Sequence, residues 1–343
     1  MEEIKKRYSN FELLKVISII MVLILHYFNG NMGGALRHVP IYSYNYYVMH
    51  FLESMSIIAV NCFVLVSGYF MIGKNQVKLI KALNLATIAI FYGGVFYLFT
   101  SLLGINGLTF SIKEFLLALV PFYGAKWFVA SYIVLFALSP FLNKLLTQLT
   151  KRQFQQFLIV LIVTLSIMPT LLRDLSYNDN GYGVLSFVLL YCIAAYFKLH
   201  YSNSLSKWFY LGLYLLSVTV TFGLAITGFQ NYDYNSFFNL LSAVSIFLFF
   251  SKLNIEFKAI NYLATFTFPI YLIHTEPPLR EIIFRDILRT NLFWNSNWFF
   301  LHLVISVTII FFGCVLIELS RKLFLNLFWK REKLKYLKKV SIG

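Results

Sequence analysis

Charged side chains are scarce in this sequence: Asp, Glu, Lys and Arg make up 13% of its 343 residues, whereas hydrophobic residues make up 59%. No polar stretch is long enough to fold as a separate soluble domain, so the composition predicts a polytopic membrane protein. Cysteine is also rare. The three cysteines lie inside apolar runs at unrelated spacings, which excludes a disulfide framework and a zinc pattern; they are Cys62, Cys192 and Cys314.

Several signals of catalysis or nucleotide binding are absent as well. The chain has no internal repeat, glycine-rich phosphate loop, nucleophile elbow or metal-binding motif. What it has is a series of apolar segments near the length that spans a bilayer. They predict an all-α fold of about ten transmembrane helices, with both termini cytoplasmic and a basic tail at 321–343; the helices are expected at roughly 11–29, 50–72, 79–102, 126–145, 154–172, 183–199, 208–229, 236–251, 260–276 and 298–320.

Acidic residues are half as frequent as basic ones, and the formal net charge is +15. If the N-terminus is cytoplasmic, 22 of the 29 Lys and Arg fall on the cytoplasmic side and seven fall outside. This asymmetry is the positive-inside bias of membrane proteins. The charge therefore sets the topology and attracts anionic lipid, and it does not require a nucleic-acid partner.

The first apolar segment, Asn10 to Asn29, carries ionisable residues that a lipid-facing helix would exclude. At about 100° per residue, Glu12, Lys15 and His26 share one face. Lys15 and His26 are eleven residues apart, which is about 16 Å along a helix. We therefore expect this face of the helix to form one wall of an active site. The alternative is a packing histidine and an ion pair that reaches the headgroups.

A second group of candidate residues surrounds the cytoplasmic end of the second helix. The small pair Ser67–Gly68 allows a helix or ligand to approach the backbone closely. A basic triplet, Lys74, Lys78 and Lys81, follows on one helix face. This triplet could hold a phosphorylated cofactor, or it could be ordinary positive-inside charge.

The ninth segment ends in Phe268 to Pro278, FPIYLIHTEPP, where Pro269 is expected to kink the helix. Odd-numbered helices run in the same direction, so His274 is expected at the depth of His26, with Glu276 just beyond it. A second histidine at the same level favours a site, although a packing role for His274 stays open. Trp127, at the start of the fourth helix, fits an interfacial belt or a surface that stacks on substrate.

Taken in order along the chain, these sequence motifs resemble those of the acyltransferase-3 family of integral membrane acyltransferases, which modify bacterial cell-surface carbohydrates. The resemblance covers the whole length. Its motifs are Lys15 with His26 eleven positions later, the run Phe63, Ser67, Gly68 and Tyr69, the pair Trp127–Phe128 with Pro140, and Tyr271 to His274. The family usually has Arg at the position of Lys15. Lysine keeps the charge but lacks the two-pronged geometry of guanidinium.

The resemblance implies transfer of an acetyl group from cytoplasmic acetyl-CoA to a hydroxyl of a surface polysaccharide or its lipid-linked precursor, at the plasma membrane. No permanently bound cofactor and no metal are expected. The implied roles are catalysis by His26 and His274, acetyl-CoA binding by Lys15, Lys78 and Lys81, and support from Glu12, Ser67, Gly68, Trp127, Tyr271 and Glu276.

Two questions stay open in the sequence. His26 could act as general base on the sugar hydroxyl or as a transient acyl carrier, because an imidazole can do either. A non-catalytic flippase of lipid-linked glycans would also have many helices and a basic cytoplasmic face. Such transporters usually show internal repeats or charges in several helices, and neither is found here, so the enzyme is favoured.

Overall fold

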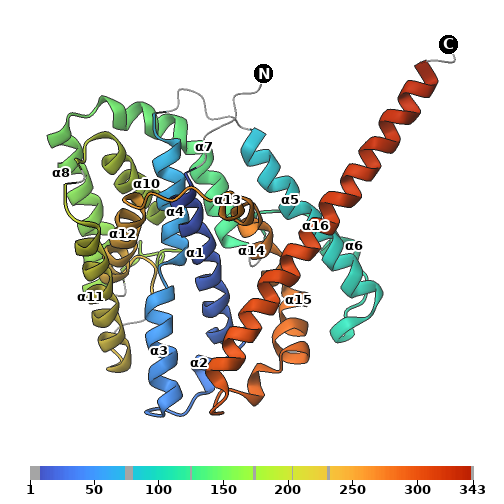
Figure 1. The fold of residues 1–343 in the computed structure, drawn as a ribbon, viewed down its shortest axis with the longest axis horizontal. Helices are drawn as coiled ribbons and strands as arrows, with labels where there is room; N and C mark the ends of the chain where they lie inside the picture. The colour runs from blue at the N-terminus through green and yellow to red at the C-terminus, as the bar shows by residue number, and fades with distance from the viewer. Residues whose placement is uncertain are drawn as a thin grey trace.

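The computed structural model describes residues 8–73, 80–123, 126–172, 175–202, 204–229 and 232–340, and within them all regular structure is helical. Figure 1 shows the arrangement. The longer helices are α1 (Ser9–Phe28), α3 (Tyr44–Ser56), α4 (Ala59–Met71), α5 (Ile80–Leu102), α7 (Trp127–Gln148), α8 (Lys151–Ile162), α10 (Val184–Leu199), α11 (Lys207–Ile226), α12 (Phe237–Ser251), α14 (Thr267–Thr275) and α16 (Phe299–Val340). Shorter helices connect them: α2 (Ala35–His38), α6 (Ile112–Ala118), α9 (Met168–Leu172), α13 (Lys258–Leu263) and α15 (Pro277–Glu281).

In the part of the chain that is described, seven helical spans are long and apolar enough to cross a membrane. Two of them join consecutive helices: α3 with α4, and α8 with α9 through a π-helical turn. The all-helical membrane fold is thus confirmed, whereas the expected count of ten and the side of the membrane that holds the termini stay predictions. The seven spans are Ser9–Phe28, Tyr44–Met71, Ala82–Leu102, Trp127–Gln148, Lys151–Leu172, Lys207–Ile226 and Phe299–Leu327.

The three remaining expected segments are helical but shorter. α10 has 16 residues and α12 has 15, about 24 Å or less at 1.5 Å per residue, against a hydrocarbon core of about 30 Å. The segment expected at 260–276 is divided into α13, a 3₁₀ turn and α14. Pro269 lies in the first turn of α14, where its missing N–H costs little, so the break comes before the proline.

The basic tail expected from residue 321 continues the last helix without interruption, because α16 runs from Phe299 to Val340. The tail contains Leu, Lys, Arg and Glu and no Gly or Pro before its end, and these residues favour helix. In Figure 1 it projects beyond the bundle, and its end lies on the same side as the start of α1. Contact of the tail with anionic lipid stays a prediction.

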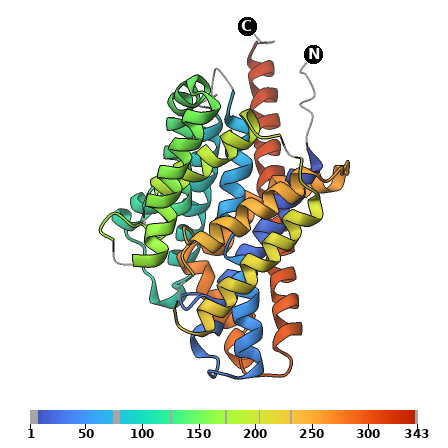
Figure 2. The same cartoon turned by 90° about the vertical axis from the view of Figure 1, so that its left-hand side faces the viewer.

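Helix α1 is the central element of the bundle. It packs against α3 and α4 on one side and against α12, α14 and α16 on others. Figure 2 shows α11 and α12 lying next to each other across the outside of the bundle, where they also make extensive mutual contact. Because α1 is surrounded, its polar side chains face neighbouring helices instead of lipid.

Candidate functional site

The polar face of α1 begins with an ion pair near its first turn. Lys15 Nζ lies 2.6 Å from Glu12 Oε2, and both side chains are partly buried. The two residues are three positions apart, a spacing that brings side chains together on one helix face. The pair therefore keeps a cation at the edge of the bundle without leaving its charge uncompensated.

The face ends with a contact between two histidines. His26 Nδ1 lies 2.7 Å from His274 Nε2, within hydrogen-bond distance, although the residues are 248 positions apart. The ring centroids are 4.9 Å apart. His274 is fully buried, whereas His26 is partly exposed. The expectation that both side chains reach the same depth agrees with this contact.

The hydrogen bonds of His274 fix the direction of the bond between the rings. Its Nδ1 is hydrogen-bonded to the carbonyl oxygen of Ile270, one helical turn earlier. A carbonyl only accepts, so Nδ1 of His274 carries the proton and, in the neutral ring, Nε2 is the acceptor. His26 Nδ1 must then donate. The tautomer of His26 that results has its lone pair on Nε2, which is the nitrogen available to take a proton or to attack an acyl group.

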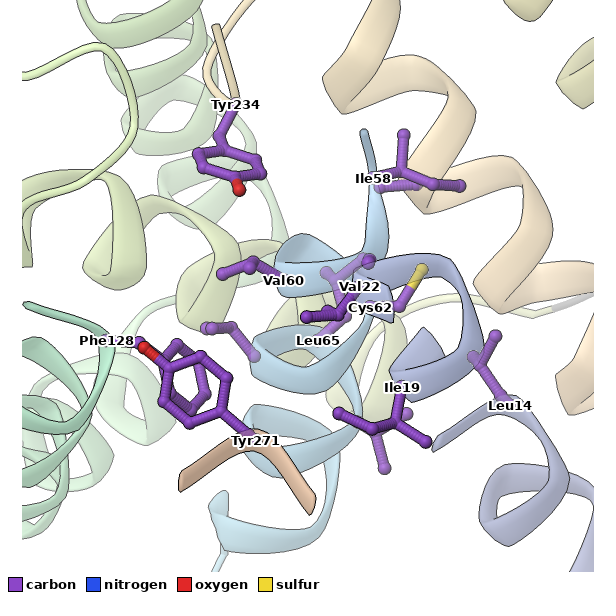
Figure 3. Close-up of a cluster of buried hydrophobic side chains, with 14 of the residues drawn as sticks. Leu14, Ile19, Val22, Ile58, Val60, Cys62, Leu65, Phe128, Tyr234 and Tyr271 are labelled. Atoms are coloured by element: carbon purple, nitrogen blue, oxygen red, sulfur yellow. The ribbon is translucent and has the colours of Figure 1, made fainter. Parts of the chain in front are cut away.

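A cavity of about 180 Å³ lies between this pair and the ion pair. Its wall includes Lys15 at one end and Val22 and Tyr271 at the other. Val22 and Tyr271 precede His26 and His274 by about one turn each, and the rings of Tyr271 and His274 are 6.3 Å apart. In Figure 3, Phe128 lies beside Tyr271, with ring centroids 5.2 Å apart. The cavity thus runs from Lys15 to within about one helical turn of the histidines, which are not themselves among its lining residues.

The second helix contributes Ser67 and Gly68 in different ways. Ser67 lines the cavity, and its hydroxyl accepts a hydrogen bond of 3.0 Å from Tyr132 and donates one to the Phe63 carbonyl. Gly68 faces α10: a Cβ there would lie 3.2 Å from both the Cβ of Ala194 and the Cα of Tyr191. Glycine is required at this position for close helix packing, whereas Ser67 faces the cavity.

Trp127 and Glu276 lie at the other end of the site from Lys15. Trp127 packs against Tyr182 and Tyr234, with ring centroids 4.6 Å and 5.7 Å away. Glu276 forms an ion pair with Lys126, Nζ to Oε1 3.2 Å, with side chains 8% and 11% exposed. Glu276 is therefore held by a cation beside the start of α7, and no direct contact with the histidines is found among the described residues.

Two of the predicted acetyl-CoA ligands cannot be placed. Lys78 falls outside the described residues, and Lys81 lies in α5 but its side chain is likewise outside them. Lys15 is consequently the one predicted basic ligand whose position relative to the cavity is described. The roles of Lys78 and Lys81 stay predictions.

Two residues with buried polar atoms were not identified as candidates from the sequence. Arg280, on α15, has a buried Nε with no hydrogen-bond partner among the described residues, and its charge acts on His26. Glu53 is buried in the span formed by α3 and α4, and its Oε2 likewise has no partner there. A carboxyl inside an apolar span is a sequence signal. Glu53 falls within the helix expected at 50–72, so this signal was present in the sequence.

Comparison with protein families matches residues 8–319 to an acyltransferase domain, the acyltransferase-3 domain. The match includes both histidines, the ion pair and every helix that lines the cavity. Comparisons with curated proteins and with solved structures gave no significant match. The chain belongs to the acyltransferase-3 family and is a multi-pass membrane acyltransferase.

Proposed function

We propose that this protein moves an acetyl group from acetyl-CoA to a hydroxyl of a cell-surface polysaccharide, or of its lipid-linked precursor, at the plasma membrane. The observation that carries the proposal is the His26–His274 contact, about one helical turn beyond a cavity that Lys15 lines at its other end. Charge at one end suits an anionic donor, and a paired imidazole at the other suits proton transfer from a hydroxyl.

The donor would lie along the cavity. The phosphates of CoA are attracted to Lys15, which is held in place by the ion pair with Glu12. Lys15 and His26 are about 16 Å apart along α1, a separation that an extended pantetheine arm can span. The mostly apolar wall, which includes Val22 and Phe63, suits the aliphatic parts of that arm.

Transfer would begin with His26 as general base. Its Nε2 takes the proton of the acceptor hydroxyl while the hydroxyl oxygen attacks the thioester carbonyl. The tetrahedral intermediate then expels the CoA thiolate, which takes the proton back from His26. His274 holds the His26 ring in the required tautomer by accepting the bond from Nδ1. Arg280, with its unpartnered Nε, is the candidate to stabilise the negative oxygen of the intermediate.

The first test is transfer of label from radiolabelled acetyl-CoA to surface polysaccharide. Membranes with the intact protein are compared with membranes that hold His26→Ala at the same abundance. We expect label in the polysaccharide with the intact protein and its loss with His26→Ala.

Label that persists with His26→Ala would remove His26 from the chemistry and direct attention to His274. Absence of label with either protein, while glycan export still depends on the chain, would overturn the transferase and favour a flippase of lipid-linked glycan. A variant at the exposed His38 serves as a control, because His38 stacks on Trp294 outside the histidine pair.

A further inference from the structure

Glu53 is a buried carboxyl that nothing in the proposed reaction uses. It is 9% exposed, and its Oε2 has no hydrogen-bond partner among the described residues. No salt bridge to Glu53 is found in that part of the chain either, although other buried carboxyls there are paired, Glu276 with Lys126 and Glu318 with Arg321. A buried polar group without a partner costs free energy, so its retention requires a reason.

The surroundings of Glu53 are aromatic. The Glu53 carboxyl is close enough to Tyr182, Tyr232 and Tyr234 to interact with them electrostatically. Tyr182 and Tyr234 contact each other and Trp127, and the centroids of the two tyrosine rings are 5.0 Å apart. We call Trp127, Tyr182 and Tyr234 the aromatic cluster. It combines broad ring faces with the hydroxyls of two tyrosines.

The backbone of the aromatic cluster is fixed. Asn61 on α4 donates a 2.8 Å hydrogen bond to the Tyr234 carbonyl, and the Tyr234 amide donates to the Asn180 carbonyl at 3.0 Å. Gly181 packs so closely that a Cβ would lie 2.4 Å from the Cβ of Tyr234. These contacts hold two loops together over the end of α4. The rings are therefore preorganised, which lowers the entropy cost of binding.

The segment that carries Tyr232 and Tyr234 is attached to the chain on both sides of Glu53. The Tyr232 hydroxyl lies 2.7 Å from Nδ1 of His50, about one turn before Glu53 on α3, and the Tyr234 carbonyl accepts the hydrogen bond from Asn61 on α4. Glu53 lies between His50 and Asn61 in the sequence, so this segment passes along the part of the span that contains Glu53.

Figure 3 relates Tyr234 to two residues that line the cavity, Val60 and Tyr271. The Tyr234 hydroxyl points toward the side of the buried cluster that holds Val60, while Tyr271 lies on the other side of Val60. Tyr271 also acts electrostatically on Tyr234. The Tyr234 ring thus lies near the part of the cavity wall that Val60 and Tyr271 form.

Glu53 and the aromatic cluster provide the kinds of side chain that bind sugars. Aromatic rings pack against the apolar C–H faces of a sugar, and a carboxyl oxygen without a partner among the described residues can bond to a sugar hydroxyl. Burial, with a contribution from Glu53, raises the pKa of Tyr182 and that of Tyr234 above the ordinary tyrosine value. Their hydroxyls consequently stay protonated at neutral pH and can donate to sugar oxygens.

We propose that Glu53 and the aromatic cluster form the acceptor subsite, in which Glu53 binds a non-reacting hydroxyl of a neutral sugar unit and so sets which hydroxyl meets His26. This inference rests on the proposed function for the identity of the acceptor. It assigns Glu53 to substrate positioning and leaves proton transfer to His26.

The test is direct binding, measured by calorimetry on the full-length protein in nanodiscs. The probe is a set of oligosaccharides cut from de-O-acetylated surface polysaccharide of the source cells. We expect saturable binding by the wild type and at least roughly tenfold weaker binding by Glu53→Gln, the loss typical of one hydrogen bond at a buried group. Glu256→Gln, at an exposed position, is the matched control and is expected to bind like the wild type.

Activity and stability measurements separate the possible outcomes. In acetyl transfer, Glu53→Gln should raise the KM for the acceptor and leave the KM for acetyl-CoA unchanged. Its unfolding temperature should stay close to that of the wild type, because Gln is nearly isosteric with Glu and Oε2 of Glu53 has no hydrogen-bond partner to lose among the described residues. Tyr234→Phe, which keeps the ring, should weaken oligosaccharide binding severalfold.

The inference is overturned if the wild type binds none of the oligosaccharides, or if Glu53→Gln binds them as tightly as the wild type. It is also overturned if Glu53→Gln unfolds at a lower temperature while Tyr234→Phe binds normally, since Glu53 would then be structural. Binding that depends on Glu53 without any acetyl transfer would instead overturn the proposed function and leave the sugar site in place.

Discussion

His26 Nδ1 and His274 Nε2 meet at 2.7 Å across two helices that are remote in sequence. The hydrogen bond between the two rings has a defined direction. The Ile270 carbonyl accepts a hydrogen bond from Nδ1 of His274, so the only proton of a neutral His274 ring is on Nδ1. His274 therefore has the position of an orienting group and His26 that of the reacting group. The two histidines are not equivalent, and substitution should affect them differently.

Replacing His274 with Phe should lower kcat by roughly 100-fold or more, the range for a disrupted acid–base group. His26 would lose the acceptor that selects its tautomer. The KM for acetyl-CoA should change little because Lys15 and the cavity remain. Steady-state kinetics in proteoliposomes measure both parameters, with His38→Phe as the control. A wild-type kcat in His274→Phe would show that the contact is only structural.

The choice between general base and acyl carrier can be tested without an acceptor. As a general base, His26 forms no covalent bond to the acetyl group, so protein incubated with labelled acetyl-CoA should carry no label at His26 after a rapid quench. Intact-protein mass spectrometry at millisecond delays is the measurement. An acetyl adduct on His26 that disappears when acceptor is added would establish the carrier mechanism instead.

Lys15→Met should raise the KM for acetyl-CoA by roughly tenfold or more, as expected for one lost charge-assisted contact. Lys15→Arg should restore most of the affinity, because charge attraction is what the position supplies. Lys144, exposed on α7, provides the control Lys144→Met. An unchanged KM in Lys15→Met would place the CoA phosphates elsewhere.

Gly68→Ala should destabilise the protein by about 1–3 kcal/mol, the cost of overpacking, since the new Cβ would press on Ala194 and Tyr191 of α10 at 3.2 Å. The comparison is Gly223→Ala on α11, where no atom lies within 4 Å and where alanine should stabilise the helix by up to about 1 kcal/mol. Thermal unfolding in detergent reports both. Equal unfolding temperatures of Gly68→Ala and Gly223→Ala would mean that α4 and α10 can move apart to accept the new Cβ at little cost.

Substituting one partner of the Lys126–Glu276 ion pair should lower the free energy of unfolding more than substituting both partners. Glu276→Gln leaves the Lys126 ammonium buried without its countercharge, which costs about 3–5 kcal/mol. The double variant Lys126→Met with Glu276→Gln should regain most of that loss. A double-mutant cycle on unfolding free energies measures the coupling. Additive effects of the two substitutions would show that the 3.2 Å pair is solvated.

Local features were accessible from the sequence because they depend on helix periodicity alone. The apolar runs identified the helices, and the spacing of Glu12 and Lys15 predicted an ion pair that the structure contains. Helix length was predicted less well. α10 and α12 are too short to count as full spans, and α16 continues past residue 320, since the limits of an apolar run need not be the limits of a helix.

Contacts between remote segments required the tertiary structure. The depth of His274 could be expected from helix direction, but its hydrogen bond to His26 depends on how α14 packs against α1. The partner of Glu276 and the isolation of Glu53 depend on packing in the same way. The sequence alone determined a helical membrane protein of this family with a charged and a histidine-bearing end on its first helix. Only the packing of helices decided which polar groups meet, because hydrogen bonds act over about 3 Å while helix periodicity carries no information about the neighbouring helix.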